Sequence, residues 1–154
     1  MVLTGAGISV ASGIPTYRDH AGLWQRSDPI QHKQFMDQHY YRQRYWARSM
    51  IGWLPVNHAH PNDTHHALAN FESSGKQSLL VTQNVDGLHQ SAGSENVCDL
   101  HGRLDRVICT DCGELLDRRD VQNWLQADNA WLLEVSAEPR PDGDADYDRE
   151  DIHD

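Results

Sequence analysis

A glycine-rich segment near the start of the chain has the composition of a phosphate-binding turn. Gly5, Gly7 and Gly13 follow the short apolar run of residues 1–4, which we predict to be the end of a buried strand. Glycines at such a place let the backbone turn tightly and bring N–H groups close to a phosphate at the start of a helix. Val10 occupies the third glycine position of the common G-x-G-x-x-G fingerprint, so a plain turn is the alternative.

Two side chains after this segment suit a closing loop. Residues 14–19 read Ile-Pro-Thr-Tyr-Arg-Asp. Arg18 would add a charge-assisted hydrogen-bond donor beside a phosphate, and Tyr17 would add an apolar lid. The alternative for Arg18 and Asp19 is a surface ion pair.

A second polar cluster, Thr-Gln-Asn-Val-Asp-Gly-Leu-His, occupies residues 82–89. It follows the apolar run 78–82, which predicts a strand, and α/β folds bind ligands at the carboxyl ends of parallel strands. The amides of Gln83 and Asn84 and the carboxylate of Asp86 offer the donors and acceptors that ribose hydroxyls and a carboxamide require. A turn with capping side chains is the alternative.

His101 follows the apolar stretch 97–100, which predicts another strand. A neutral imidazole is the natural general base at physiological pH. Because the chain contains 10 histidines, a structural role is the alternative for this one.

Cys109 and Cys112, followed by Gly113, form the C-x-x-C-G pattern of a zinc knuckle. A structural zinc site needs four ligands, and the chain supplies one such pair. Spacing makes the other candidates poor ligands: Cys98, His101 and His153. A thioredoxin-like redox pair would require a helix opening at the first cysteine, whereas the helical pattern begins only near Asp117. We therefore predict half of a zinc site.

The elements that must position these residues alternate along the chain. Apolar spacing and capping signals predict three helices: residues 34–54 closed by Pro55, Asn62 or Asp63 to Gly75, and Asp117 through Leu125. The predicted strands are residues 1–4, 78–82 and 97–100. This alternation predicts an α/β layer fold with a parallel sheet.

Composition and charge exclude several kinds of partner. The chain has 154 residues and a formal charge of −10, and residues 128–154 alone hold ten acids and two bases. We therefore expect no direct nucleic-acid binding, and a solvated loop or disordered end over 142–154. No apolar run approaches the length of a membrane span, and the N-terminus lacks a signal-peptide pattern. Three cysteines suit a reducing compartment, so we expect a cytoplasmic protein, or a mitochondrial one if a eukaryotic presequence is missing.

Taken together, these segments resemble the sirtuins, the family of NAD-dependent protein deacylases. The matching motifs lie, in this order, at residues 5–9, 12–19, 82–89, 99–102 and at the cysteine pair. Five motifs in this order and spacing are specific, and the resemblance covers Val2 to about Gly143. Residues 103–105 and the acidic stretch 141–146 are similar to the second class of sirtuins, which includes a mitochondrial member.

The resemblance implies a partial Rossmann-like parallel sheet with helices, plus half of a small zinc-ribbon module. Residues 1–104 would form a partial NAD-binding domain with a helical segment at about 20–75, and residues 105–154 an incomplete zinc-binding module with an acidic end. The implied reaction transfers an acyl group from a protein or peptide lysine to ADP-ribose and releases nicotinamide.

The resemblance also implies roles for individual residues. His101 would be the general base, acting through the ribose hydroxyls, and Cys109 and Cys112 would hold a structural Zn²⁺. The implied NAD-binding residues are Gly5, Ala6, Gly7, Ser9, Gly13, Ile14, Pro15, Tyr17, Arg18, Gln83, Asn84 and Asp86.

The chain departs from the family pattern at both ends. Its first strand starts at Met1, and the second cysteine pair, the acyl-lysine channel and the later strands of the family have no counterpart in it. We therefore expect roughly the first half of a sirtuin, inactive by itself. The alternatives are a binding module that holds a partner through its zinc knuckle without catalysis, and a chain that does not fold stably alone.

Overall fold

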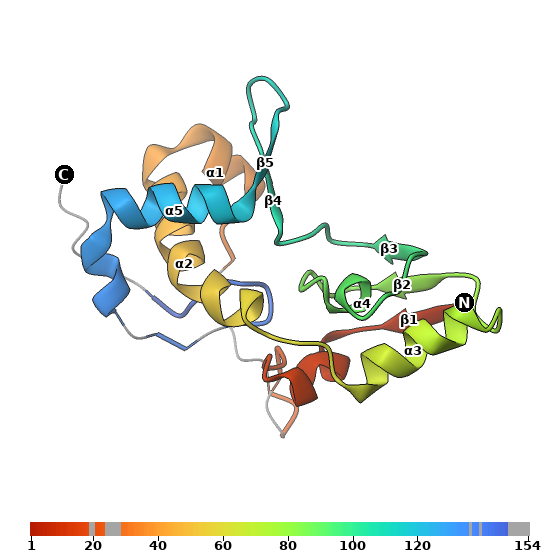
Figure 1. The fold of residues 1–154 in the computed structure, drawn as a ribbon. Coiled ribbons are helices and arrows are strands. Elements are labelled where there is room, and N and C mark those ends of the chain that lie inside the picture. The colour runs from red at the N-terminus through yellow and green to blue at the C-terminus, as the bar shows by residue number, and fades with distance from the viewer. Residues whose placement is uncertain (19–20, 24–28, 136, 139, 148–154) are drawn as a thin grey trace.

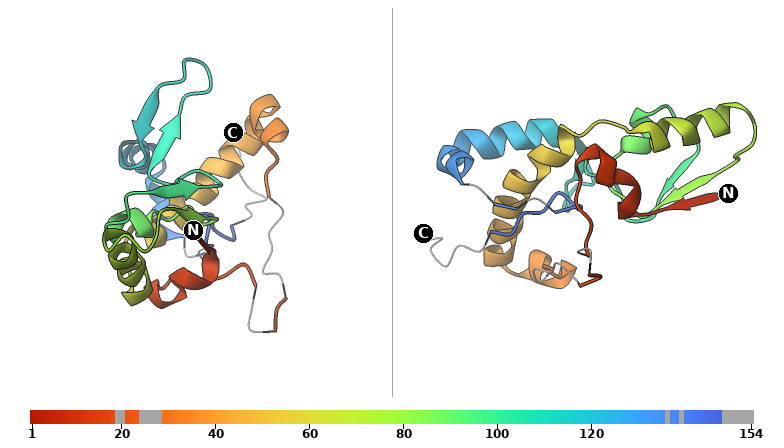
Figure 2. Two further views of the ribbon diagram at one scale, coloured as in Figure 1. Left: turned by 90° about the vertical axis from the view of Figure 1, so that its right-hand side faces the viewer. Right: turned by 90° about the horizontal axis from the view of Figure 1, so that it is seen from below.

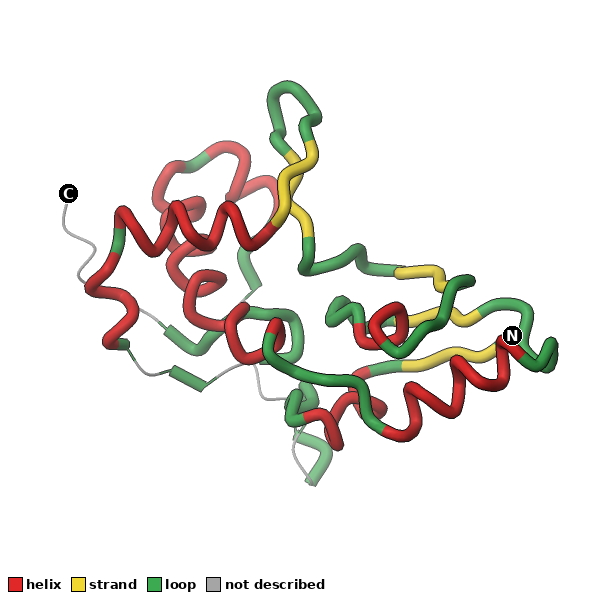
Figure 3. Tube along the Cα trace, in the orientation of Figure 1, coloured by secondary structure: helices red, strands yellow, loops and turns green. Residues whose placement is uncertain are grey.

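The computed structural model of the chain describes residues 1–18, 21–23, 29–135, 137–138 and 140–147 (Figure 1). Among these residues, the strands form a three-stranded sheet and a separate two-stranded hairpin, which Figure 3 shows in different parts of the molecule. Within the same ranges, no helix has both the length and the apolar character needed to cross a membrane. Predictions on Asp19, His153 and residues 148–154 lie outside the described residues.

The three-stranded sheet confirms the predicted parallel α/β layer. It consists of β1 (Val2–Thr4), β2 (Leu80–Thr82) and β3 (Val97–Asp99), in the order β1-β2-β3 with all strands parallel. Thr4 pairs with Thr82, and Thr82 pairs with Asp99, so the three strands end level with one another. The loops that follow the three strands therefore leave the sheet on the same side, at the carboxyl ends of the strands.

Two helices cover one face of this sheet (Figure 2). They are α3 (Asp63–Ser73) and the short α4 (Leu88–Ser91). The Asn62 side chain caps α3 by accepting a hydrogen bond from the Thr64 N–H, and Gly75, at φ 72°, ends it. The N–H of Gly75 bonds to Glu72 O and the N–H of Lys76 to Phe71 O, the Schellman pattern. The predicted start and stop of this helix are confirmed.

The predicted helix over 34–54 is two helices, α1 (His32–Asp37) and α2 (His39–Asn57). They are separated by Gln38, whose backbone is extended. The prediction that Pro55 closes the helix is wrong, because α2 continues through it to Asn57. Proline costs most where its missing N–H interrupts a long helix, and here it lies in the last turn, which the burial of Val56 holds in place.

The second half of the chain packs on α2. A hairpin of β4 (Arg106–Ile108) and β5 (Leu115–Asp117) leads into α5 (Arg118–Asp128) and the 3₁₀ helix η2 (Ala130–Glu134). Asp117, where the helix was predicted to begin, caps α5 by accepting a hydrogen bond of 2.7 Å from the Arg119 N–H. The hairpin strands β4 and β5 and the helix η2 were not predicted.

The expectation of a solvated acidic loop is wrong for its described part. Asp144 is paired with Arg48 of α2, whose side chain is 2% exposed, and Ala145 is fully buried. Gly52 permits this contact, because a Cβ there would lie 2.1 Å from the Asp144 carbonyl oxygen. The buried arginine explains why an acidic segment folds against a helix instead of staying in solvent.

Candidate nucleotide-binding site

The glycine-rich segment leaves β1 as a 3₁₀ helix, η1 (Ala6–Ser12), and not as a plain turn. Gly13, at φ 85°, ends it. The side chain of Asn62, which also caps α3, donates to Ile8 O at 2.8 Å and to Ser12 Oγ at 2.9 Å. The segment is therefore fixed to the helical layer beside the sheet.

A hydrogen-bond network joins the two predicted polar clusters. Ser9 Oγ donates to Asp86 Oδ2 at 2.7 Å, and Asn84 Nδ2 donates to Ser9 Oγ at 3.1 Å. The other carboxylate oxygen of Asp86 accepts the Leu88 N–H at 2.9 Å, at the start of α4. Ser9 is 1% exposed, so the three polar groups hold one another in fixed orientations. This arrangement can present amide and carboxylate groups to a polar ligand without first reorganising.

A small cleft lies at this network, beside the carboxyl ends of the strands. Seven of its lining residues belong to the predicted NAD-binding set, and Val85 and Pro141 do not. Those seven are Ala6, Ser9, Ile14, Tyr17, Gln83, Asn84 and Asp86. Pro141 had no signal in the sequence, because only the docking of the acidic segment brings it to the cleft. The other members of the predicted set flank the cleft instead of lining it: Gly5, Gly7, Gly13, Pro15 and Arg18.

The predicted closing loop sits at the edge of the cleft. Partial burial, reinforced by the carboxylates of Asp142 and Asp144, raises the pKa of Tyr17 to about 12, so its phenol is a neutral donor at physiological pH. Arg18 donates from Nη1 to Gly22 O at 2.8 Å. The structure thus places the aromatic ring at the cleft, while this bond directs the guanidinium into its own loop.

His101 lies in the turn after β3, at the same edge of the sheet. Its Nδ1 is 3.0 Å from Gln83 O, and a carbonyl can only accept, so Nδ1 carries the proton. The Nε2 atom is then the basic nitrogen, on an exposed side chain. The N–H of Gln83 bonds to Thr4 O, so the ends of β1 and β2 and the turn after β3 are linked. His101 does not line the cleft itself but is bonded to Gln83, which does, and a base held in one tautomer there is suited to accept a proton from a hydroxyl.

The cysteine pair lies in the connection between β4 and β5, away from this cleft. The Cys109 N–H bonds to Glu114 O and the Gly113 N–H to Cys109 O, with Gly113 at φ 76°. Hydrogen bonds from the Cys112 and Asp111 backbone lower the pKa of the Cys109 thiol, which favours the thiolate that zinc requires. Cys98 lies on β3, in the other sheet. Across the described ranges, no three His, Cys, Asp or Glu side chains gather as a metal site.

Comparison with known proteins identifies the family of this chain. Residues 5–134 match the Sir2 family, and the chain belongs to that family. It is 53% identical over 151 residues to NAD-dependent protein deacetylase 2 of Bradyrhizobium diazoefficiens, covering 98% of this chain and 55% of the relative. It is 52% identical over 147 residues to the NAD-dependent protein deacetylase of Xanthomonas campestris pv. campestris, covering 96% of this chain and 50% of the relative. The chain thus spans about half the length of the curated relatives it matches.

Solved structures agree with this assignment. A Sir2 homologue in complex with NAD superposes with a TM-score of 0.59 at 41% identity, over 76% of this chain and 46% of that one. A Sir2 protein with deacetylated p53 peptide and 3′-O-acetyl ADP-ribose superposes with a TM-score of 0.69 at 34% identity, over 82% and 51%. The Rossmann-like sheet predicted from the sequence is therefore confirmed as the fold of these proteins.

Proposed function

We propose that this chain carries the nucleotide-binding part of an NAD-dependent protein-lysine deacylase, which transfers an acyl group to ADP-ribose and releases nicotinamide. The names of its relatives support this, since they are NAD-dependent protein deacetylases. The ligands of the similar structures also support it, since they include NAD, ADP-ribose products and a p53 peptide. The proposed substrate is an acyl-lysine protein or peptide in the cytoplasm.

The observation that carries the proposal is the network of Ser9, Asn84 and Asp86. It offers a buried hydroxyl, an amide and a carboxylate beside the apolar Ile14, a set of hydrogen-bond donors and acceptors that fits a nicotinamide carboxamide and the adjoining ribose. NAD, when bound, supplies the ribose carbon that receives the acyl oxygen as nicotinamide leaves. Asn84 and Asp86 would hold the nicotinamide, and Gln83 would contact the ribose.

The remaining residues would complete the site around the same edge. Gly5, Ala6 and Gly7 would lie along the phosphates, because they directly follow the carboxyl end of β1. Tyr17 would close over the ribose as a neutral, partly apolar cover, and Arg18 would follow it with the loop. His101 would accept a ribose hydroxyl proton at Nε2, since its Nδ1 proton is directed to Gln83 O.

We also propose that Cys109 and Cys112 supply two of the four ligands of a structural Zn²⁺. The backbone donors around the Cys109 thiol suit a metal-bound thiolate, so the pair fits half of a tetrahedral site. The other two ligands would have to come from outside the described residues. The metal would stabilise the hairpin, away from the nucleotide cleft.

The alternatives for the 154 residues are a binding module without catalysis and a chain that does not fold stably alone. We expect no deacylation of an acyl-lysine peptide by these residues alone, because the resemblance to the sirtuins gives the acyl-lysine channel no counterpart in them.

Isothermal titration with NAD and ADP-ribose tests the proposal. The chain should bind both, and Asp86→Ala should weaken NAD binding at least about tenfold, the cost of losing one charged contact. The matched control is Asp120→Ala, which removes an exposed carboxylate in the first turn of α5. Circular dichroism checks that each variant is folded. NAD affinity unchanged in folded Asp86→Ala, or lowered equally in both variants, would reject the assignment of this cleft.

A further inference from the structure

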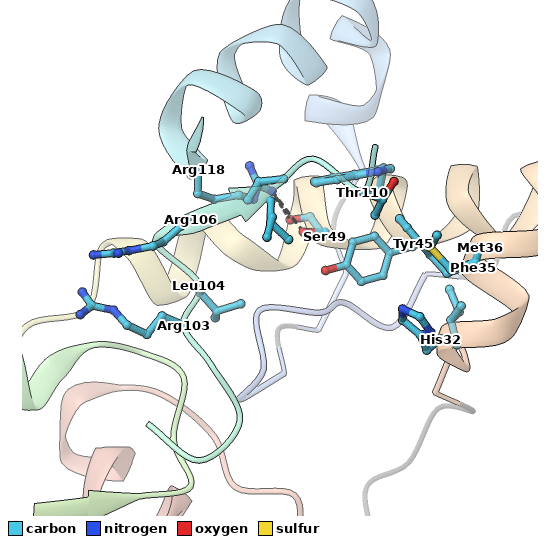
Figure 4. Close-up of a pocket in the computed structure, with 14 residues that line it drawn as sticks. His32, Phe35, Met36, Tyr45, Ser49, Arg103, Leu104, Arg106, Thr110 and Arg118 are labelled. Atoms are coloured by element: carbon cyan, nitrogen blue, oxygen red, sulfur yellow. Dashed lines mark hydrogen bonds between the residues drawn. The ribbon is translucent and has the colours of Figure 1, made fainter. Parts of the chain in front are cut away.

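A second, larger cavity is separate from the nucleotide cleft, and Figure 4 shows the side chains that line it. Its volume is about 420 Å³, and it is bounded by α1, α2, the β4–β5 hairpin and the start of α5. It shares no lining residue with the nucleotide cleft. Its lining is mainly apolar and aromatic, with Ile30, Phe35, Met36, Tyr45, Trp46, Leu104, Val107 and Ile108.

Arg118 places a buried positive charge at this cavity. The residue is 4% exposed, and its guanidinium stacks 4.8 Å from the Trp53 ring and 5.6 Å from the Trp46 ring. Its Nη2 donates to Ser49 Oγ at 3.1 Å, the contact drawn in Figure 4. Burial lowers the pKa of Arg118 to about 10, which still leaves it charged at neutral pH.

This charge has no carboxylate partner among the residues that the structure describes. Its Nη1 is fully buried and has no hydrogen-bond partner within the part of the chain that the structure describes. The described residues that line the cavity include no aspartate or glutamate. Arg103 and Arg106 add positive charge there, and both are paired with Asp105, which does not line it. An uncompensated buried cation is costly, so such a group calls for a counter-charge that enters the cavity.

The geometry points to a binding site for a small apolar carboxylate. The carboxylate would accept from Arg118 Nη1, and its hydrocarbon or aryl body would lie among the apolar side chains that Figure 4 shows opposite, Phe35 and Met36. A guanidinium supplies directed donors for a carboxylate, and the apolar lining rewards the burial of the body. A phosphate would leave most of this lining without a partner, so the cavity favours a singly charged, largely apolar anion.

Two features of the ligand can be tested separately with simple probes. Octanoate carries both the charge and the apolar body, octanamide the body alone, and acetate the charge alone. Binding is followed by isothermal titration and by tryptophan fluorescence, because Trp46 and Trp53 flank the guanidinium. We expect saturable octanoate binding, at least tenfold weaker binding of octanamide, and no measurable binding of acetate.

Variants locate the site. Arg118→Gln should weaken octanoate binding at least tenfold, whereas Arg119→Gln removes the same charge from the exposed neighbour and should leave binding unchanged. Because Arg118→Gln removes two ring contacts and could unfold the chain, Met36→Trp gives an independent test. Met36 is 42% exposed at the cavity, so a larger side chain there should block entry without disturbing the fold.

Three results with the 154-residue chain would overturn the assignment. They are the absence of saturable octanoate binding, equal affinity for octanoate and octanamide, and unchanged octanoate affinity in folded Arg118→Gln and Met36→Trp. A longer natural form of the chain that loses octanoate binding would also overturn it, because its own polypeptide would then fill the cavity. Retained binding with the expected order of probes and variants supports it.

Discussion

The nucleotide cleft and the Arg118 cavity treat buried polar groups in opposite ways. At the cleft, Ser9, Asn84 and Asp86 satisfy one another at distances of 2.7–3.1 Å, although Ser9 and Asp86 are 77 residues apart. At the cavity, a guanidinium is stacked on rings and keeps one nitrogen without a described hydrogen-bond partner. The polar groups of the cleft are therefore held in place before a ligand binds, whereas the guanidinium at the cavity requires an added negative charge as its partner.

The largest effect should come from the proposed base at the organised cleft. In a form of the protein that deacylates an acyl-lysine peptide, His101→Ala should lower turnover by about 10²–10⁴-fold, the usual contribution of a general base. NAD affinity should change little, because His101 is an exposed side chain beside the network. Mass spectrometry of the peptide measures turnover, and titration measures NAD binding. Unchanged turnover would remove His101 from the mechanism.

The stability of the chain should depend strongly on the ion pair between Asp144 and the buried Arg48 of α2. Asp144→Ala leaves Arg48, which is 2% exposed, without this carboxylate and should lower the free energy of unfolding by about 3 kcal/mol. The control, Asp128→Ala, removes an exposed carboxylate at the end of α5 and should change it by less than about 0.5 kcal/mol. Urea denaturation measures both. Equal effects would show that the acidic segment is not anchored by this pair.

Two buried histidines beneath the cleft should give the molecule a pH dependence. His65 of α3 and His89 of α4 are stacked with ring centroids 4.9 Å apart, and His89 Nε2 lies 2.9 Å from Thr4 Oγ1. Burial lowers the pKa of both, while Asp86 opposes the shift at each and Asp99 at His89. The unfolded chain therefore takes up protons first, so stability should fall as the pH drops below about 6.5.

The test is the slope of unfolding free energy against pH between about 5 and 8. His89→Gln keeps a donor for Thr4 but cannot titrate in this range, so its slope should be shallower than that of the unmodified chain. His60→Gln changes an exposed histidine that acts on neither ring and should leave the slope as it was. Identical slopes in all three proteins would exclude the pair as the source.

The smallest effect should be at the cysteine pair. Two thiols without two further ligands bind zinc weakly, so the chain should lose zinc to a mild chelator, and Cys109→Ser should change its stability by less than about 1 kcal/mol. Cys98→Ser, on β3, is the control. Metal analysis after dialysis gives the readout. One zinc per chain that survives the chelator would show that other side chains complete the site.

Local signals predicted much of this fold. The capping residues Asn62 and Asp117 and the stop at Gly75 act on their own helices, so the sequence near them was sufficient. Pro55 misled, because the burial of neighbouring side chains held the last turn of α2 against proline's local preference.

At the candidate site, too, the residues marked by local sequence were predicted, and those that depend on distant contacts were not. Asn84 and Asp86 were predicted from the polar cluster that follows a strand, and Ser9 from the resemblance to the sirtuins. Parallel strands that end level bring the loops that carry these residues together. Pro141 and the Arg48–Asp144 pair were missed, because both depend on a contact between residues 96 positions apart. The charge pattern of the acidic segment predicted only a solvated loop. Arg118 carried no signal, since its burial follows from the rings of α2.

The most direct test of the central claim is an NMR titration of the ¹⁵N-labelled chain with NAD. The amide signals of Gly5 and Asp86 and the side-chain NH₂ of Asn84 should shift together and saturate with one affinity. The Nε–H signal of Arg118, at the separate cavity, should stay in place and serves as the internal reference. Shifts at Arg118 without shifts at Asn84 and Asp86, or no saturable shift at the cleft, would contradict the account.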